Sequence, residues 1–172
     1  MAYIGLTIDS AYTAAVCGRS TAELHLTLAH IPVGSKTALQ DEVPGAVIAD
    51  LDLLWAYTAP QVLVLGDVER FGAVLVRKAY GLGLPGLRAR VADLLDLHGV
   101  RYSKDYEPWA PHVSVGLNTP QWCWVKDIKN PVHIQAHSSR AVFAGLSGIV
   151  AHHWPLGGAL RDPVSTDTLP GV

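Results

Sequence analysis

The sequence is poor in charged residues, and this shortage excludes one large class of partners. Charged residues make up 16% of the 172 residues, and 13 Lys and Arg against 15 Asp and Glu give a formal net charge of −2. Proteins that bind long duplex nucleic acid normally present a strongly basic face. The near-neutral charge therefore predicts no binding to duplex DNA. A small anionic ligand is still compatible with it, because one or two local cations suffice to bind such a ligand.

Cysteines and long apolar runs are also scarce. Cys17 and Cys123 are the only cysteines, and without C-x-x-C spacing they argue against a structural zinc site. We interpret both as reduced residues that pack as small hydrophobes. No apolar run reaches the roughly 18 residues that cross a bilayer, and the opening "MAYIGLTIDS" lacks the basic region of a signal peptide. These features predict a cytoplasmic protein that is not bound to a membrane.

The residues that are present indicate an α+β protein with one sizeable core. Hydrophobic residues make up 49% of the chain, which suits a single domain of one or two lobes. The Gly- and Pro-rich tail, 147–172, is predicted to be partly loop or disordered. The domain then spans 1–146. A helix is expected over 83–100, and weaker helical signals lie in 37–59. Strand-like patterns group around these helices and favour antiparallel sheets; they occur at 3–9, 20–34, 60–72, 73–80, 109–117, 131–139 and 140–146.

Two of the strand-like segments carry the same polar pattern, "HLTL" at 25–28 and "HVSV" at 112–115. Strand alternation places His25 and Thr27 on one face of the first segment and the leucines on the other. The second segment likewise presents His112 and Ser114 on one face. If the two strands lie near each other, two imidazoles and two hydroxyls converge on one cleft.

Such a cleft suits phosphodiester cleavage without a metal. An unperturbed histidine has a pKa of about 6.5, so near neutral pH one imidazole accepts a proton while a second donates one. One ring activates water or a ribose hydroxyl, and the other protonates the leaving oxygen. The two hydroxyls donate hydrogen bonds to the non-bridging phosphate oxygens and stabilise the charge that builds up there.

The ordered pair of motifs resembles the 2H phosphoesterase superfamily, which includes LigT-like 2′,3′-cyclic phosphodiesterases, cyclic nucleotide phosphodiesterases and viral anti-defence members. The resemblance covers roughly residues 1–146 and extends to "PHVSVG" and to the mid-chain "VLGDVERFG". It implies two lobes, with two antiparallel sheets and flanking helices, around a pseudo-twofold central cleft. It further implies that His25 and His112 are the catalytic acid/base pair, that Thr27 and Ser114 bind the phosphate, and that no cofactor or metal is needed.

Other residues near the motifs are candidates for substrate contacts. Tyr106 and Trp109, just before the second motif, and Tyr12, after the first strand, are aromatic residues that could stack on a nucleobase. His30 stands where the family commonly has phenylalanine. Continued alternation places His30 on the leucine face, where we interpret it as structural.

Several functions remain open at this point. The substrate is expected to be a small nucleotide, either a 2′,3′-cyclic phosphate, with an RNA 3′ end as one form of it, or a cyclic or 2′–5′ or 3′–5′ linked signal. If the protein is viral, cleavage of such a nucleotide signal would make it a counter-defence factor that acts in the host cytoplasm. One alternative is a non-catalytic module that sequesters a nucleotide, and another is an RNA-processing phosphodiesterase acting on RNA ends. A metallohydrolase that uses the extra histidines is disfavoured, because no Asp or Glu stands near them at ligand spacing.

Overall fold

The computed structural model describes residues 2–10, 24–32, 45–104, 108–117, 134–145 and 150–158. Within these residues the chain forms two helices, α2 (Gly45–Ala56) and α3 (Leu84–Leu97). The strands are β1 (Ala2–Thr7), β2 (His25–Ile31), β3 (Gln61–Phe71), β4 (Val74–Tyr80), β5 (His112–Leu117), β6 (Ile134–Ser138), β7 (Arg140–Ala144) and β8 (Val150–Pro155). Pairs of strands alternate with the helices as expected and the neighbouring strands are antiparallel, so the predicted α+β class is confirmed.

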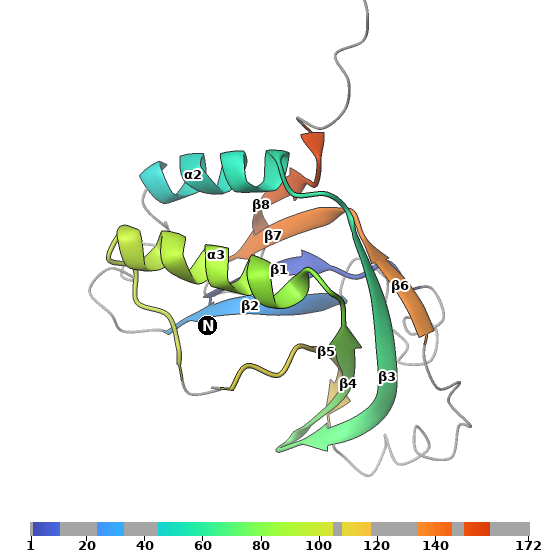
Figure 1. Ribbon diagram of the computed structural model, residues 1–172. Helices are drawn as coiled ribbons and strands as arrows, with labels where there is room; N and C mark the ends of the chain where they lie inside the picture. The colour runs from blue at the N-terminus through green and yellow to red at the C-terminus, as the bar shows by residue number, and fades with distance from the viewer. Residues whose placement is uncertain are drawn as a thin grey trace, which may run out of the picture.

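These eight strands belong to one curled sheet with the order β6-β3-β4-β5-β2-β1-β7-β8, and each pair of neighbours is antiparallel. The two antiparallel sheets expected from the sequence are thus joined into a single sheet. The junction is the pairing of β2 with β5, which brings together the inner edges of two four-stranded halves (Figure 1). Because each half carries one His-containing motif on its inner strand, the duplicated arrangement expected from the sequence is present.

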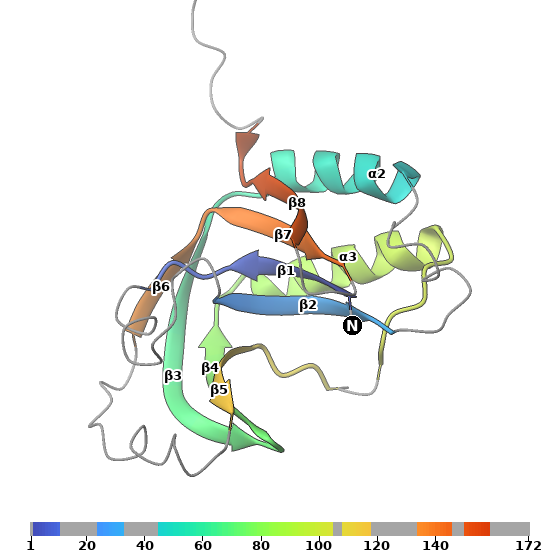
Figure 2. The same ribbon diagram turned by 180° about the vertical axis from the view of Figure 1, so that it is seen from behind.

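The core lies between the sheet and the two helices. Helix α3 packs against β2 and helix α2 against β8, and the two helices also contact each other, as the two opposite views show (Figures 1 and 2). Alternation puts the apolar face of β1 and β2 into this core, where Ile4, Leu6, Leu26 and Leu28 are at most 1% exposed. No helix of the described residues is long and apolar enough to cross a bilayer.

The sheet continues past residue 146, where the tail was expected to begin. Strand β8 pairs with β7, and its Trp154 is buried against Trp55 of α2 with ring centroids 6.3 Å apart. The Trp154 indole N–H also donates a hydrogen bond to Asp52. Residues 150–158 therefore belong to the folded domain, because burial of Trp154 outweighs the local Gly and Pro content. Residues 159–172, Cys17 and Cys123 lie outside the described residues.

Gly5 of β1 allows the close approach of β1 to β2, which carries the first motif. A Cβ atom on Gly5 would lie 2.6 Å from the backbone oxygen of Leu26, so that the strands would have to move apart. We expect Gly5→Ala to destabilise the protein by about 1–3 kcal/mol. Gly86→Ala is the matched control, because the Cβ position of that helical glycine is open, and this change should stabilise by about 0.5–1 kcal/mol.

Urea unfolding of the two variants and the wild type checks this prediction. Equal stability of Gly5→Ala and Gly86→Ala would show that the contact between β1 and β2 is not as tight as the structure indicates.

Candidate active site

The pairing of β2 with β5 sets the relative position of the two motifs. The paired residues are Leu26 and Val113, the central apolar residue of each motif, and both are fully buried. In an antiparallel ladder, the neighbours on one side of this pair are Thr27 and His112, and those on the other side are His25 and Ser114. All four point to the face opposite the buried pair. Each histidine is therefore set beside the hydroxyl of the other motif, as expected for two halves related by a pseudo-twofold axis.

A β-bulge lies at the same place in each motif. Against β1, the register of β2 shifts after Thr27, so that Leu28 is an extra residue; against β4, the register of β5 shifts after Ser114, so that Val115 is extra. A bulge bends the strand and increases its twist. The fourth position of "HLTL" and of "HVSV" is thus the bulged one in both halves, and this shared irregularity supports an internal duplication.

The bulge at Leu28 corrects the expectation for His30. An uninterrupted strand would turn His30 to the leucine face, but the extra residue shifts the alternation by one. Leu28 and Ala29 are both buried, and His30 comes back to the face that carries His25 and Thr27. The expectation was wrong because simple alternation contains no bulge.

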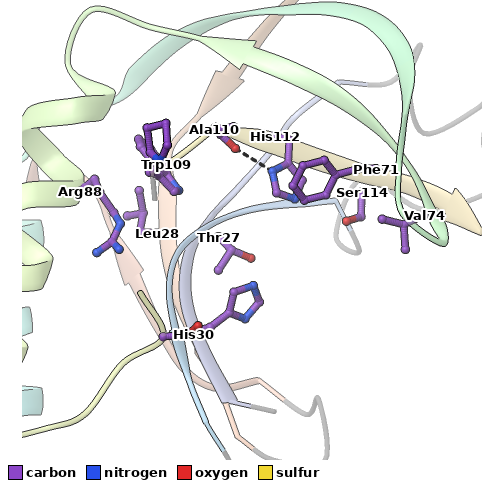
Figure 3. Close-up of a pocket in the computed structure, with 12 residues that line it drawn as sticks. Thr27, Leu28, His30, Phe71, Val74, Arg88, Trp109, Ala110, His112 and Ser114 are labelled. Carbon is purple, nitrogen blue, oxygen red and sulfur yellow. Dashed lines mark hydrogen bonds between the residues drawn. The ribbon is translucent and has the colours of Figure 1, made fainter. Parts of the chain in front are cut away.

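A cleft of about 390 Å³ opens on this face. Its volume lies within the range of about 300–1,000 Å³ that is typical of small-molecule sites. Strand β2 contributes Thr27 and His30, and β5 contributes His112 and Ser114. Figure 3 shows these side chains around one space, with Arg88 and Trp109 at one end and Phe71 and Val74 at the other. The structure thus brings together three of the four predicted motif residues and one predicted aromatic residue.

His112 is held in a defined orientation. Its Nδ1 lies 2.7 Å from the backbone oxygen of Ala110 (Figure 3), and because a carbonyl can only accept, Nδ1 carries the proton of this hydrogen bond. Phe71, the last residue of β3, lies beside the imidazole, with ring centroids 5.0 Å apart and an interplanar angle of 42°. Nε2 is therefore the nitrogen of His112 that takes no part in this hydrogen bond.

His25 lies on the same sheet face but does not line the cleft. Its ring stacks on Tyr3 of β1, with centroids 4.4 Å apart and an interplanar angle of 14°. Thr7 stands opposite His25 in the ladder, and Gly5 lies between Thr7 and Tyr3. Burial raises the pKa of Tyr3, so its hydroxyl stays protonated at neutral pH.

His30 is the titratable cleft residue whose environment most clearly disfavours its charged form. Burial lowers its pKa from the ordinary 6.5, and the positive charges of His112, His25 and Arg88 lower it further. At neutral pH His30 is accordingly a neutral imidazole. It adds a polar group to the cleft without adding charge.

This lowered pKa predicts a pH dependence of stability. Well above pH 6.5 the ring is neutral in both the folded and the unfolded chain, so that it contributes no dependence there. Below that pH the unfolded chain takes up the proton first, and stability falls as the pH falls. We expect the free energy of unfolding to drop more between pH 7 and pH 5 in the wild type than in His30→Gln. Urea unfolding at both values checks this; parallel losses would contradict it.

Among the predicted aromatic contacts, Trp109 lines the cleft and is partly exposed to it. Tyr106 and Tyr12 lie outside the described residues. Sequence reasoning missed Phe71 and Arg88 as cleft residues. The sequence does carry a sign that Arg88 is unusual. It is a charged residue at a position of α3 that shares the apolar face with Leu84, Val91 and Leu95.

The histidines of the cleft do not form a ligand set for a metal in the structure. Within the described ranges, no three or more His, Cys, Asp or Glu side chains gather closely enough to hold a metal ion. Two other histidines of those ranges contact residues away from the cleft: Nε2 of His98 on α3 lies 2.7 Å from the Asp50 carboxylate of α2, and His152 of β8 stacks on Trp154.

Comparison with known proteins relates this fold to solved structures. No family model and no curated protein sequence matches the chain. The crystal structure of TT0787 from Thermus thermophilus superposes with a TM-score of 0.59 at 18% identity, covering 91% of this chain and 98% of that one. A crystal structure of a phosphoesterase gives 0.55 at 15% identity, covering 90% and 94%. The MHV ns2 PDE domain gives 0.51 at 14% identity, covering 90% and 88%.

These similarities extend over nearly the whole of each chain, so they concern the complete eight-stranded arrangement rather than one motif. The fold places two H-x-[T/S] motifs on the paired inner strands of a duplicated sheet. The resemblance inferred from those motifs is thus confirmed at the level of the fold, and the chain has the fold of the 2H phosphoesterases.

Proposed function

We propose that the protein is a metal-independent phosphodiesterase that cleaves a ribonucleotide phosphodiester by acid/base catalysis with His25 and His112. The observation that carries the proposal is the pairing of Leu26 with Val113. It sets both motifs on one sheet face, where Thr27, His112 and Ser114 line one cleft. Two of the structures with this fold are a phosphoesterase and a PDE domain, which supports the same chemistry here.

The roles follow from the geometry. With the phosphate between the two motifs, the hydroxyls of Thr27 and Ser114 donate hydrogen bonds to its non-bridging oxygens, where negative charge builds up. Nε2 of His112 exchanges a proton with one of the two reacting oxygens, because its Nδ1 is bound to Ala110. His25, across from Ser114, exchanges a proton with the other oxygen. The aromatic ring of Trp109 borders the cleft and stacks on the base.

The composition of the cleft supports a small nucleotide as substrate. Arg88 gives it one permanent positive charge, and none of the lining residues that the structure describes is acidic. The proposed substrates are a 2′,3′-cyclic phosphate or a cyclic or linked nucleotide signal. Cleavage of a signal would give a viral protein a counter-defence role.

One observation favours a second candidate function, sequestration of a nucleotide without turnover. The His25 ring stacks on Tyr3 instead of lining the cleft. In a sequestering module this arrangement would be permanent, whereas in an enzyme His25 must present a nitrogen to the substrate. Turnover decides between the two functions.

The test is incubation of the protein with a panel of cyclic and linear ribonucleotides in excess EDTA, with products separated by chromatography. We expect cleavage that survives chelation and is lost in the double variant His25→Ala/His112→Ala. Tight binding without cleavage of any panel member would establish sequestration instead. Cleavage that EDTA abolishes would overturn the proposed mechanism.

A further inference from the structure

Arg88 stands where the helix pattern calls for an apolar residue. It is the fifth residue of α3, on the face formed by Leu84, Leu87, Val91 and Leu95, and it is only 9% exposed. A guanidinium carries a permanent charge, and burying it is costly unless acceptors satisfy it. A charge in this position therefore indicates a specific role for Arg88 beyond helix packing.

The guanidinium is fixed in place at one end of the cleft. Its Cζ lies 5.2 Å from the centroid of the Tyr102 ring, a cation–π contact. Tyr102 is itself held, because its hydroxyl donates a hydrogen bond to Asp96 over 3.2 Å. This contact holds the guanidinium beside the cleft, which Arg88 lines, and a guanidinium is the side-chain group best suited to bind a phosphate.

This end of the cleft lies beyond the pseudo-symmetric centre, which is formed by the two motifs. Because β2 and β5 are antiparallel, the end of β2 beyond Thr27 and the segment before His112 run to the same end of the cleft. Arg88 and Trp109 lie at this end, and His30 lines the cleft from the nearby part of β2 (Figure 3). His30 is neutral at neutral pH, so Arg88 supplies the permanent charge of this end.

We propose that Arg88, beside Trp109 at this end of the cleft, is a subsite for a second phosphate of the substrate, beyond the phosphodiester held by the two motifs. The proposal rests on the proposed function and narrows it. The preferred substrate carries at least two phosphates, as a linked, cyclic or terminally phosphorylated oligonucleotide does. A nucleoside 2′,3′-cyclic monophosphate leaves this end empty and is a poorer substrate.

Binding measurements test the subsite without requiring turnover. Adenosine 3′-monophosphate, adenosine 3′,5′-bisphosphate and a hydrolysis-resistant phosphorothioate of cyclic diadenylate are titrated calorimetrically into the wild type, Arg88→Gln, Arg88→Lys and Arg90→Gln. Arg90 is the matched control, because it is exposed on the same helix and its loss removes the same charge. Thermal unfolding of each variant checks that it is folded. If Arg88→Gln does not fold, Arg88→Lys still tests the subsite, because it keeps the positive charge but changes the hydrogen-bonding group.

We expect a ligand with a second phosphate to bind the wild type about 10- to 100-fold more tightly than the monophosphate, as charge-assisted hydrogen bonds allow. Arg88→Gln should remove most of this advantage and lower the affinity for the monophosphate much less, whereas Arg90→Gln should keep the advantage. Arg88→Lys should keep part of it. If the bisphosphate binds more tightly than the monophosphate, the subsite accepts a terminal phosphate. If only the cyclic ligand binds more tightly, the subsite accepts an internal phosphodiester.

Two results would overturn the subsite. One is equal binding of all three ligands to the wild type. The other is an equal loss in Arg88→Gln and Arg90→Gln, which would show only the effect of net charge. If none of the three ligands binds the wild type, the proposed nucleotide function itself fails, and the subsite fails with it.

Discussion

Replacing His112 with alanine is expected to lower kcat/KM for the nucleotide substrate by about 10²- to 10⁴-fold, the usual contribution of a positioned general acid or base. The structure gives the physical reason. The hydrogen bond from Nδ1 to Ala110 and the contact with Phe71 hold the ring, so that Nε2 is already oriented when substrate arrives. The variant loses the proton exchange at one reacting oxygen.

The loss should appear mainly in kcat, because the alanine leaves Thr27 and Ser114 in place to bind the phosphate. His25→Ala should cause a loss of the same order, and the double variant should lose little more than either single one, since the two rings act in one step. His153→Ala is the control, because His153 is exposed on β8. Full activity of His112→Ala would exclude it as an acid or base.

Replacing Thr27 with valine, or Ser114 with alanine, is expected to lower kcat by about 10²- to 10³-fold, as loss of one donor to a developing negative charge does elsewhere. Valine keeps the shape of threonine and its preference for strands, so β2 should retain its structure. Thr27 stands beside His112 in the ladder and Ser114 beside His25. Because the two hydroxyls hold equivalent positions, loss of either should lower kcat to a similar degree.

Steady-state kinetics of Thr27→Val, Thr27→Ser and Ser114→Ala check this prediction. Thr27→Ser keeps the hydroxyl and should keep most of the rate. If Thr27→Val and Thr27→Ser were equally impaired, shape rather than hydrogen bonding would be the cause. Unchanged kcat in Thr27→Val and Ser114→Ala would remove both hydroxyls from the mechanism.

Much of the site could be predicted from the sequence, because strand alternation is a local property. It places His25 with Thr27 and His112 with Ser114, on the faces opposite their buried neighbours, independently of any long-range contact. The likeness of the two motifs then indicates a duplicated fold. Trp109 follows from its position just before the second motif.

Other features depend on contacts between distant segments and have no local signature. The bulge at Leu28, which turns His30 to the cleft, arises from pairing with β1. The union of two half-sheets requires β2 to meet β5. The folding of β8 into the sheet depends on the burial of Trp154 against α2. Arg88 is visible as a charge among apolar helix positions, but only the folded chain shows that it lines the cleft.

The central claim is that two histidine motifs form one metal-independent phosphodiesterase site. The pH profile of kcat/KM, measured in excess EDTA for the wild type and for His112→Ala, tests it most directly. The wild type should give a bell-shaped profile, because one histidine must be neutral while the other is protonated, and His112→Ala should lose one limb together with most of its rate. A wild-type rate that does not change between pH 5 and pH 9, or a profile that His112→Ala leaves intact, would contradict the claim.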